Sequence, residues 1–166
     1  KESPEEIGYD NIKYNLSESS VTDIKISELN LSLSDLKLEY IGHRGKPELR
    51  QLITNDCGNL NEQNVLLTTG AAGALFIINT SLLTAEDHLI VVRPNYATNI
   101  EVPRTIGCSI SFIDQNFENN WKLNPDEIST AVRPNTTLIS ITTPHNPTGM
   151  LMGTEAITTL ILIAEQ

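Results

Sequence analysis

The sequence predicts an α/β fold of three layers, in which a mostly parallel sheet carries helices on both faces. From about residue 64 onward, short apolar runs alternate with helix-like segments, an order typical of parallel sheets. Residues 88–93 (HLIVVR) have an apolar centre, as expected for a strand that is buried on both sides. Glycine or proline lies at many boundaries between these segments.

The composition is that of an ordinary water-soluble protein of one domain's length. The 166 residues are 39% hydrophobic and 19% charged. The formal net charge of −10 argues against nucleic acid or an anionic membrane surface as a general partner. No apolar run approaches the length that spans a bilayer. Cys57 and Cys108 form neither a metal-ligand spacing nor a disulfide framework, so we expect a reduced, cytoplasmic setting.

Residues 1–45 have the least regular pattern and are predicted to form an N-terminal arm and the start of a small domain. Residues 13–20 are polar, and residues 24–38 alternate apolar and polar side chains only loosely. A short strand is expected at residues 24–29. The poor periodicity indicates that this arm packs on something else, such as a second subunit. Residues 46–166 are predicted to form a second, more regular domain.

The first elements of this second domain follow from turn residues and apolar spacing. A helix is predicted at residues 47–56, because a proline suits its first turn and a glycine follows its end. Residues 64–69 (NVLLTT) predict a strand and residues 74–83 an apolar helix, with a turn of small residues between them. Residues 88–93 are the next strand.

The later elements repeat this alternation. A helix at residues 97–106 would be limited or kinked by its internal proline. Residues 108–113 (CSISFI) predict a strand. A helix is predicted over residues 124–132, with asparagine as its cap and proline in its first turn. Residues 137–142 (TLISIT) predict the last strand, and a helix-like run follows from about residue 154.

Three segments that follow predicted strands could form a binding site. The small residues Gly70, Ala71 and Ala72 leave backbone N–H groups open at a helix start, which suits a phosphate; tight packing of the helix on the sheet explains them equally well. Tyr96 can stack on a planar ring, although a half-buried tyrosine at the sheet edge is the plainer explanation. Asn146, between two prolines, can donate its amide hydrogens to a ligand or simply form a polar turn.

The order of the three segments favours a site. The carboxyl ends of parallel strands lie at one edge of a sheet, so the segments are expected to meet there. A phosphate seat, an aromatic ring and an amide together suit a phosphorylated aromatic cofactor. The patterns G-x-G-x-x-G and Gly-Lys-Ser/Thr are absent, which excludes the dinucleotide fingerprint and the P-loop.

The same segments resemble the class I/II aminotransferases, which are fold-type I enzymes dependent on pyridoxal phosphate. The resemblance covers about residues 14–166, and it implies the N-terminal portion of such an enzyme. Residues 46–166 would then be the first, truncated half of the large domain that binds the cofactor. The motifs that carry the resemblance are residues 40–50, 69–72 (TGAA), 86–91 (EDHLIV), 94–96 (PNY) and 145–149 (HNPTG).

The resemblance implies roles for individual residues toward pyridoxal 5'-phosphate. The backbone of Gly70, Ala71 and Ala72 would hold the phosphate. Tyr96 would stack on the pyridine ring, and Asn146 would bond its phenolic oxygen.

The resemblance also implies a homodimer, in which Tyr40 reaches the phosphate of the partner subunit's cofactor. The peptide bonds before Pro94 and Pro147 are expected to be cis, as in similar enzymes. The substrates implied for such an enzyme are an amino acid and a 2-oxo acid; which ones does not follow from the sequence.

No lysine of this chain matches the lysine that forms the Schiff base in the family. Lys46 and Lys122 lie in loops away from that place, and no lysine, arginine or aspartate follows Gly149. Partners for the pyridine nitrogen and the substrate carboxylate are missing for the same reason. The helical pattern is also unfinished at residue 166. We therefore expect a piece of a longer enzyme, inactive alone, with no catalytic residue of its own.

Three functions agree with these patterns. The first is an aminotransferase, and the second is another fold-type I enzyme with the same cofactor: a C–S lyase, a decarboxylase or an acyl-transferring synthase. The third is a catalytically inactive truncated relative, which the missing lysine favours. No metal is expected, because His43, His88 and His145 are not spaced as ligands.

Overall fold

The computed structural model describes residues 4–16, 21, 23–34 and 36–166. The chain divides into two compact units, Lys1–Tyr40 and Ile41–Gln166. This division falls shortly before the predicted domain boundary at residue 45, and the assignment of the two parts to an arm and a large domain stays a prediction. Residues 17–20 of the predicted polar arm lie outside the described residues.

The described residues of the N-terminal unit form only short helical turns. These are α1 (Pro4–Ile7), η1 (Tyr9–Asn11) and η2 (Ile26–Leu29), and none of their residues is buried. The strand predicted at residues 24–29 is therefore wrong. A strand needs a hydrogen-bonded neighbour, whereas η2 closes on itself and ends at Asn30 with a left-handed φ of 51°.

The second unit begins with α2 (Pro47–Asn55) and the short turn η3 (Glu62–Asn64). The helix agrees with the prediction, and its proline lies in the first turn. The strand predicted at residues 64–69 is wrong, because residues 65–68 join no sheet. In this segment the backbone N–H of Leu67 donates to the carbonyl of Arg44 at 3.1 Å, and no ladder forms around that bond.

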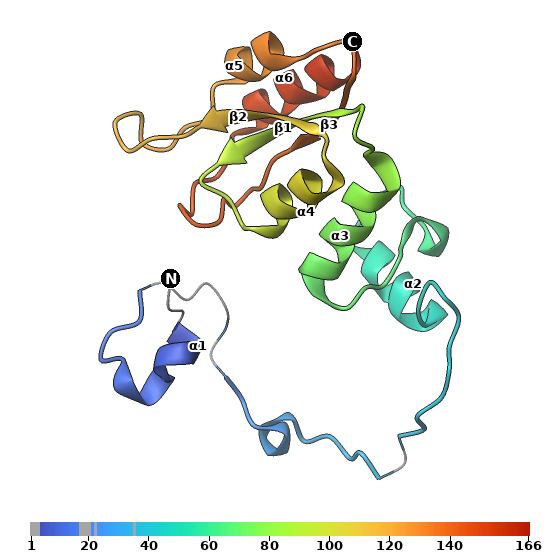
Figure 1. Ribbon diagram of the computed structural model, residues 1–166. Coiled ribbons are helices and arrows are strands. Elements are labelled where there is room, and N and C mark those ends of the chain that lie inside the picture. The colour runs from blue at the N-terminus through green and yellow to red at the C-terminus, as the bar shows by residue number, and fades with distance from the viewer. Residues whose placement is uncertain (1–3, 17–20, 22, 35) are drawn as a thin grey trace. The chain divides into compact units, whose positions relative to one another are not determined.

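The sheet has three parallel strands in the order β2-β1-β3 (Figure 1). They are β1 (His88–Arg93), β2 (Ser109–Asp114) and β3 (Thr136–Ser140), which confirms three of the four predicted strands in this part of the chain. The central strand β1 is buried at every position before Arg93. An apolar strand centre thus marks the middle of the sheet, as the sequence predicts.

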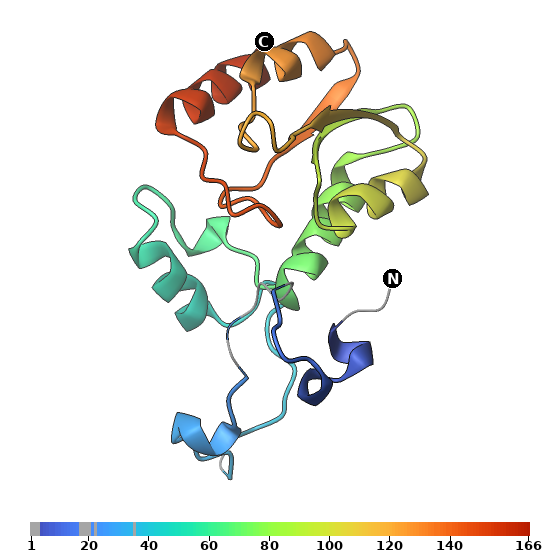
Figure 2. The same cartoon turned by 90° about the vertical axis from the view of Figure 1, so that its left-hand side faces the viewer.

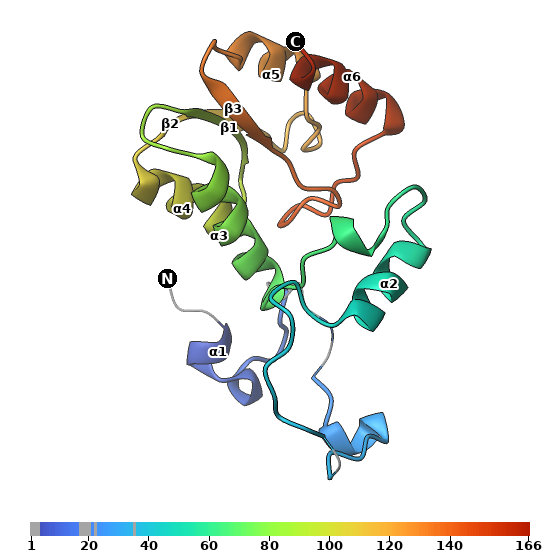
Figure 3. The same ribbon diagram turned by 90° about the vertical axis from the view of Figure 1, so that its right-hand side faces the viewer.

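Helices cover both faces of the sheet, which confirms the predicted three layers. Figures 1 to 3 show α3 (Gly70–Leu82) and α4 (Thr98–Ile106) on one face, and α5 (Pro125–Ala131) and α6 (Thr154–Ala164) on the other. α3 starts earlier than predicted, because the turn of small residues is its first turn. α4 continues through Pro103, which is buried inside it.

Alternating side chains of β1 supply both cores, since successive residues of a strand point to opposite faces. Leu89 and Val91 belong to the core beneath α3 and α4, together with Leu83 and Cys108. The core beneath α5 and α6 is formed by Ile90, Val92, Ile113, Ile128, Leu160 and Ile163. Both layers of helices are therefore fixed to the same central strand.

The connections after the strands place a crevice at the carboxyl end of the sheet. The chain leaves β1 into α4 on one face and leaves the neighbouring strand β3 into α6 on the other (Figure 3). Where the connections from two adjacent strands diverge in this way, open α/β sheets bind their ligands.

Candidate functional site

A cleft of 630 Å³ lies at this divergence between β1 and β3. It is lined by the first turns of α3, by residues that follow β1, and by the end of β3 with the loop beyond it. Five of the six residues predicted from the sequence meet here. They are Gly70, Ala71, Ala72, Tyr96 and Asn146.

The start of α3 offers open backbone N–H groups to the cleft. The residue before the helix, Thr69, provides no side-chain cap. Gly70 has a φ of 75°, which favours glycine, and the space where a side chain would stand is empty. Since Gly70, Ala71 and Ala72 are exposed and small, the first turn presents the backbone N–H groups of Ala71 and Ala72 and the positive end of the helix dipole to a ligand. The N–H of Gly70 donates to the carbonyl of Thr68 at 3.0 Å.

Tyr96 is held by two asparagines that sequence reasoning assigned no role. Oδ1 of Asn95 accepts the backbone N–H of Tyr96 and the side-chain amide of Asn99, both at 2.8 Å. The amide of Asn95 donates in turn to the carbonyl of Val92 at 2.9 Å. These bonds fix the backbone of Tyr96, and the residue is 48% exposed and lines the cleft.

Asn99 also joins the two sides of the cleft. It is buried, and its Oδ1 accepts a long hydrogen bond of 3.4 Å from the hydroxyl of Ser140 at the end of β3. The spacing of Asn95 and Asn99, one turn apart at a helix start, is the sequence signal that could have marked them.

Asn146 lies on a tight turn after β3. Its side chain is exposed and has no hydrogen bond within the described part of the chain, so both its donor and its acceptor are available to a ligand. The turn is closed by the N–H of Gly149, which donates to the carbonyl of His145 at 2.6 Å. The peptide bonds before Pro94 and Pro147 are cis, as expected, and so is the bond before Pro144.

The buried side chain of His145 contacts this turn from the inside of the protein. Its side chain is buried, and its Nδ1 lies 2.8 Å from the hydroxyl oxygen of Thr148. Burial lowers the pKa of His145, and the neighbouring backbone of Pro94 opposes part of that effect. The imidazole is therefore neutral at physiological pH.

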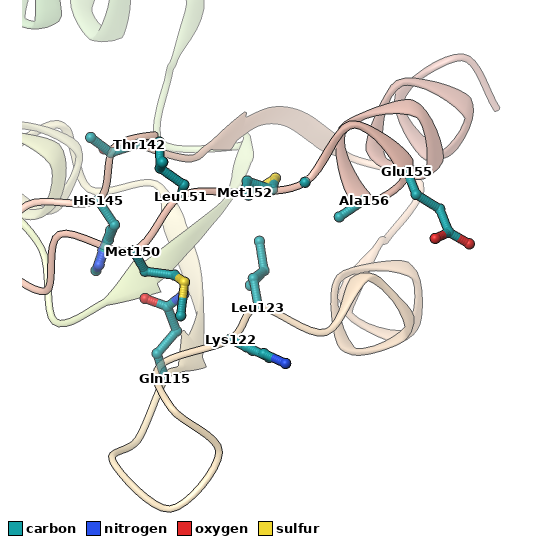
Figure 4. A pocket seen from close by; sticks show the side chains of 11 residues that line it. Gln115, Lys122, Leu123, Thr142, His145, Met150, Leu151, Met152, Glu155 and Ala156 are labelled. Atoms are coloured by element: carbon teal, nitrogen blue, oxygen red, sulfur yellow. The ribbon is translucent and has the colours of Figure 1, made fainter.

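A second cavity of 380 Å³ lies behind the turn, on the side of α6 (Figure 4). Gln115 and His145 line one part of it, and each has a buried atom, Oε1 and Nε2 respectively, without a hydrogen-bond partner in the described ranges. Lys122 and Glu155 line another part, with methionine and leucine side chains between the two parts. Lys122 is thus separate from the cleft that Asn146 lines.

The cleft contains no lysine, arginine or aspartate among its lining residues. Lys46 directly precedes α2. Tyr40 is fully exposed and belongs to the N-terminal unit, so its predicted role toward a partner's cofactor stays a prediction. Over the described ranges, no three histidine, cysteine or acidic side chains gather as metal ligands would. None of the helices in these ranges is long and apolar enough to cross a membrane.

Residues 11–166 match the family of class I and II aminotransferases. The chain belongs to this family. Family members depend on pyridoxal phosphate, which confirms the cofactor class predicted from the sequence.

Individual relatives agree with this membership. A probable aspartate aminotransferase of Methanocaldococcus jannaschii is 29% identical over 139 residues, which cover 81% of this chain and 36% of that protein. Kynurenine–oxoglutarate transaminase 1 of Mus musculus is 27% identical, over 77% of this chain and 34% of that protein. The crystal structure of a PLP-dependent aminotransferase from Streptococcus suis matches with a TM-score of 0.76 at 28% identity, over 80% of this chain and 36% of that one. The chain therefore spans about a third of the length of these relatives.

Proposed function

We propose that this chain is the cofactor-holding part of a pyridoxal-phosphate-dependent aminotransferase, which exchanges an amino group between an amino acid and a 2-oxo acid. The cleft between β1 and β3 carries the proposal. It unites an open helix start, a half-exposed aromatic ring and a free amide, each supplied by a different segment. These groups match the three parts of the cofactor: its phosphate, its aromatic ring and its phenolic oxygen.

The residues of the cleft would bind and orient the cofactor. The backbone at Gly70, Ala71 and Ala72 would hold the phosphate, with the N–H groups of Ala71 and Ala72 as donors and Gly70 leaving the approach open. Tyr96 would pack against one side of the ring, and the amide of Asn146 would donate to the phenolic oxygen. When bound, the cofactor supplies an electron-withdrawing ring that stabilises negative charge on the substrate.

The covalent and proton-transfer steps are assigned to the whole protein and to none of the residues described above. The cleft has no amine that could attach the cofactor and no cation that could bind a substrate carboxylate. Binding and orientation of the cofactor are therefore the share of these residues in the reaction.

The assembly and the setting are part of the same proposal. A homodimer would bring Tyr40 of one subunit to the phosphate in the other, and the exposed position of Tyr40 is compatible with that role. A cytoplasmic location accords with the two free cysteines, Cys57 and Cys108.

The reaction can be tested with the intact protein, pyridoxal phosphate, an amino acid and a 2-oxo acid. We expect the swapped pair to form, that is, the oxo acid of the donor and the amino acid of the acceptor. Release of carbon dioxide or sulfide without the swapped pair would replace the proposal by a decarboxylase or a C–S lyase. Acyl transfer without the pair would indicate a synthase.

The absence of a lysine from the cleft favours one further candidate, a relative that binds the cofactor without turning over a substrate. Equilibrium dialysis of the protein with pyridoxal phosphate separates the candidates. Binding without any product supports the inactive relative, whereas undetectable binding contradicts both it and the aminotransferase.

A further inference from the structure

The amide of Asn146 depends on its turn for its position. No hydrogen bond holds the side chain within the described part of the chain, and the residue is exposed. An amide that must meet a ligand oxygen within hydrogen-bond distance is then only as well placed as the backbone beneath it.

Both the backbone N–H and the carbonyl of His145 form hydrogen bonds that close the turn. Its N–H donates to the carbonyl of Met150 at 2.8 Å, and its carbonyl accepts the N–H of Gly149 at 2.6 Å. Asn146 therefore lies inside a loop that starts and ends on hydrogen bonds to the preceding residue.

The imidazole adds a third tie within the same loop. Nδ1 of His145 lies 2.8 Å from the hydroxyl of Thr148, which also accepts the backbone N–H of Met150 at 3.3 Å. The ring is 4% exposed and lies beside the backbone of Pro94, in the segment that leads from β1 to Tyr96. One buried side chain thus contacts the supports of both the amide and the aromatic ring.

We propose that His145 is a positioning residue for Asn146 and acts through the contact between its Nδ1 and Thr148. The proposal rests on the proposed function, in which Asn146 binds the cofactor. The other ring nitrogen, Nε2, is buried and has no hydrogen-bond partner within the described part of the chain, so the proposed role belongs to Nδ1. The two nitrogens can therefore be separated by substitution.

Asparagine and glutamine can each replace one of the two ring nitrogens of histidine as a polar group. The amide of asparagine places a polar atom near the position of Nδ1, whereas the amide of glutamine reaches the position of Nε2. In His145→Asn the tie to Thr148 can form, and in His145→Gln it is lost. Thr148→Val removes the same tie from the opposite side while it keeps the volume of the side chain.

The measurement is the dissociation constant of pyridoxal phosphate for the intact protein, prepared free of cofactor and followed by the absorbance of the cofactor. We expect His145→Gln and Thr148→Val each to weaken binding about tenfold, the effect of one lost hydrogen bond, and His145→Asn to stay within about threefold of the wild type. The double variant His145→Gln/Thr148→Val should bind no more weakly than Thr148→Val, because that substitution already removes the contact with Nδ1.

The free energy of unfolding, measured in urea for each variant, distinguishes positioning from a general loss of structure. A purely structural role would lower both stability and affinity in His145→Asn as much as in His145→Gln, and this result would overturn the proposal. Weaker binding in the asparagine variant alone would assign the role to Nε2 and would also overturn it. If the wild-type protein fails to bind the cofactor, the proposed function itself is wrong.

Discussion

The amino and carboxyl ends of the three strands differ in how far their polar side chains are hydrogen-bonded within the protein. At the amino end, the ring of His88 is fully buried, and its nitrogens lie 2.7 Å from the hydroxyl of Thr136 and 2.9 Å from that of Ser111. The guanidinium of Arg133 donates to the same serine hydroxyl at 3.0 Å. The polar groups at this end are therefore bonded to one another.

At the carboxyl end, several polar groups are left without partners. Asn146 and Tyr96 are open to the cleft, and the buried atoms Gln115 Oε1 and His145 Nε2 have no hydrogen-bond partner among the residues that the structure describes. A buried polar group without a partner costs stability, so such groups are expected where a ligand completes them. The comparison indicates that the amino end serves stability and the carboxyl end serves binding.

The largest effect is expected from His88→Ala. The substitution opens a cavity and leaves two hydroxyls without their partner, so the free energy of unfolding should fall by about 3 kcal/mol. Urea unfolding of the variant and the wild type gives this difference. The affinity of the folded variant for pyridoxal phosphate should be unchanged. A loss of affinity would contradict the assignment of the amino end to stability and of the carboxyl end to binding.

The next effect concerns the cleft. Tyr96→Ala should weaken binding of pyridoxal phosphate about tenfold, because a stacking surface is removed from a site whose backbone remains. Stability should change little, since the side chain is half exposed. Tyr96→Phe is the matched control and should bind nearly as the wild type does; equal weakening in both variants would assign the effect to the hydroxyl.

A smaller effect is expected from pH. Burial and the nearby charge of Arg133 lower the pKa of His88 below its ordinary value of 6.5, and burial lowers that of His145. The unfolded chain therefore takes up protons more readily than the folded protein. Stability should be complete above about pH 6.5 and should fall as the pH falls below it. Urea unfolding between about pH 8 and about pH 5 measures this slope, and His88→Ala should reduce it.

The sheet could be predicted from the sequence because the apolar pattern of each strand indicates how deeply that strand is buried. The apolar centre of β1 is what a strand covered on both faces requires, and β2 and β3 carry half-buried or buried apolar residues beside it. The segment at residues 64–69 has a similar pattern but lacks a hydrogen-bonded neighbour, and this is a property of the fold that no local pattern contains.

The groups that bind could be predicted, whereas the groups that hold them could not. Tyr96 and Asn146 follow the strands β1 and β3, so their meeting at one edge of the sheet follows from strand order. Gly70 lines the same cleft at the start of α3, although the strand predicted before it does not form. The hydrogen bond from Ser140 to Asn99 joins the last residue of β3 to the first turn of α4, over a separation of 41 residues. Its existence depends on the side-by-side position of β1 and β3, which only the structure shows.

The smallest effect tests whether the binding groups at the carboxyl end of the sheet are confined to the side of β1 that faces β3. On the other side, Arg93 of β1 donates two hydrogen bonds of 2.7 Å to Asp114 of β2, and its guanidinium lies 4.1 Å from the ring of Phe112. Arg93→Lys loses the two parallel hydrogen bonds to Asp114 and the stacking on Phe112. Because this ion pair is exposed, the free energy of unfolding should fall by less than about 1 kcal/mol. The difference should shrink further at high salt, and the affinity for pyridoxal phosphate should stay constant. Weaker cofactor binding in this variant would show that the binding region extends across β1 to β2, because Arg93 is bonded toward β2 and not toward the cleft.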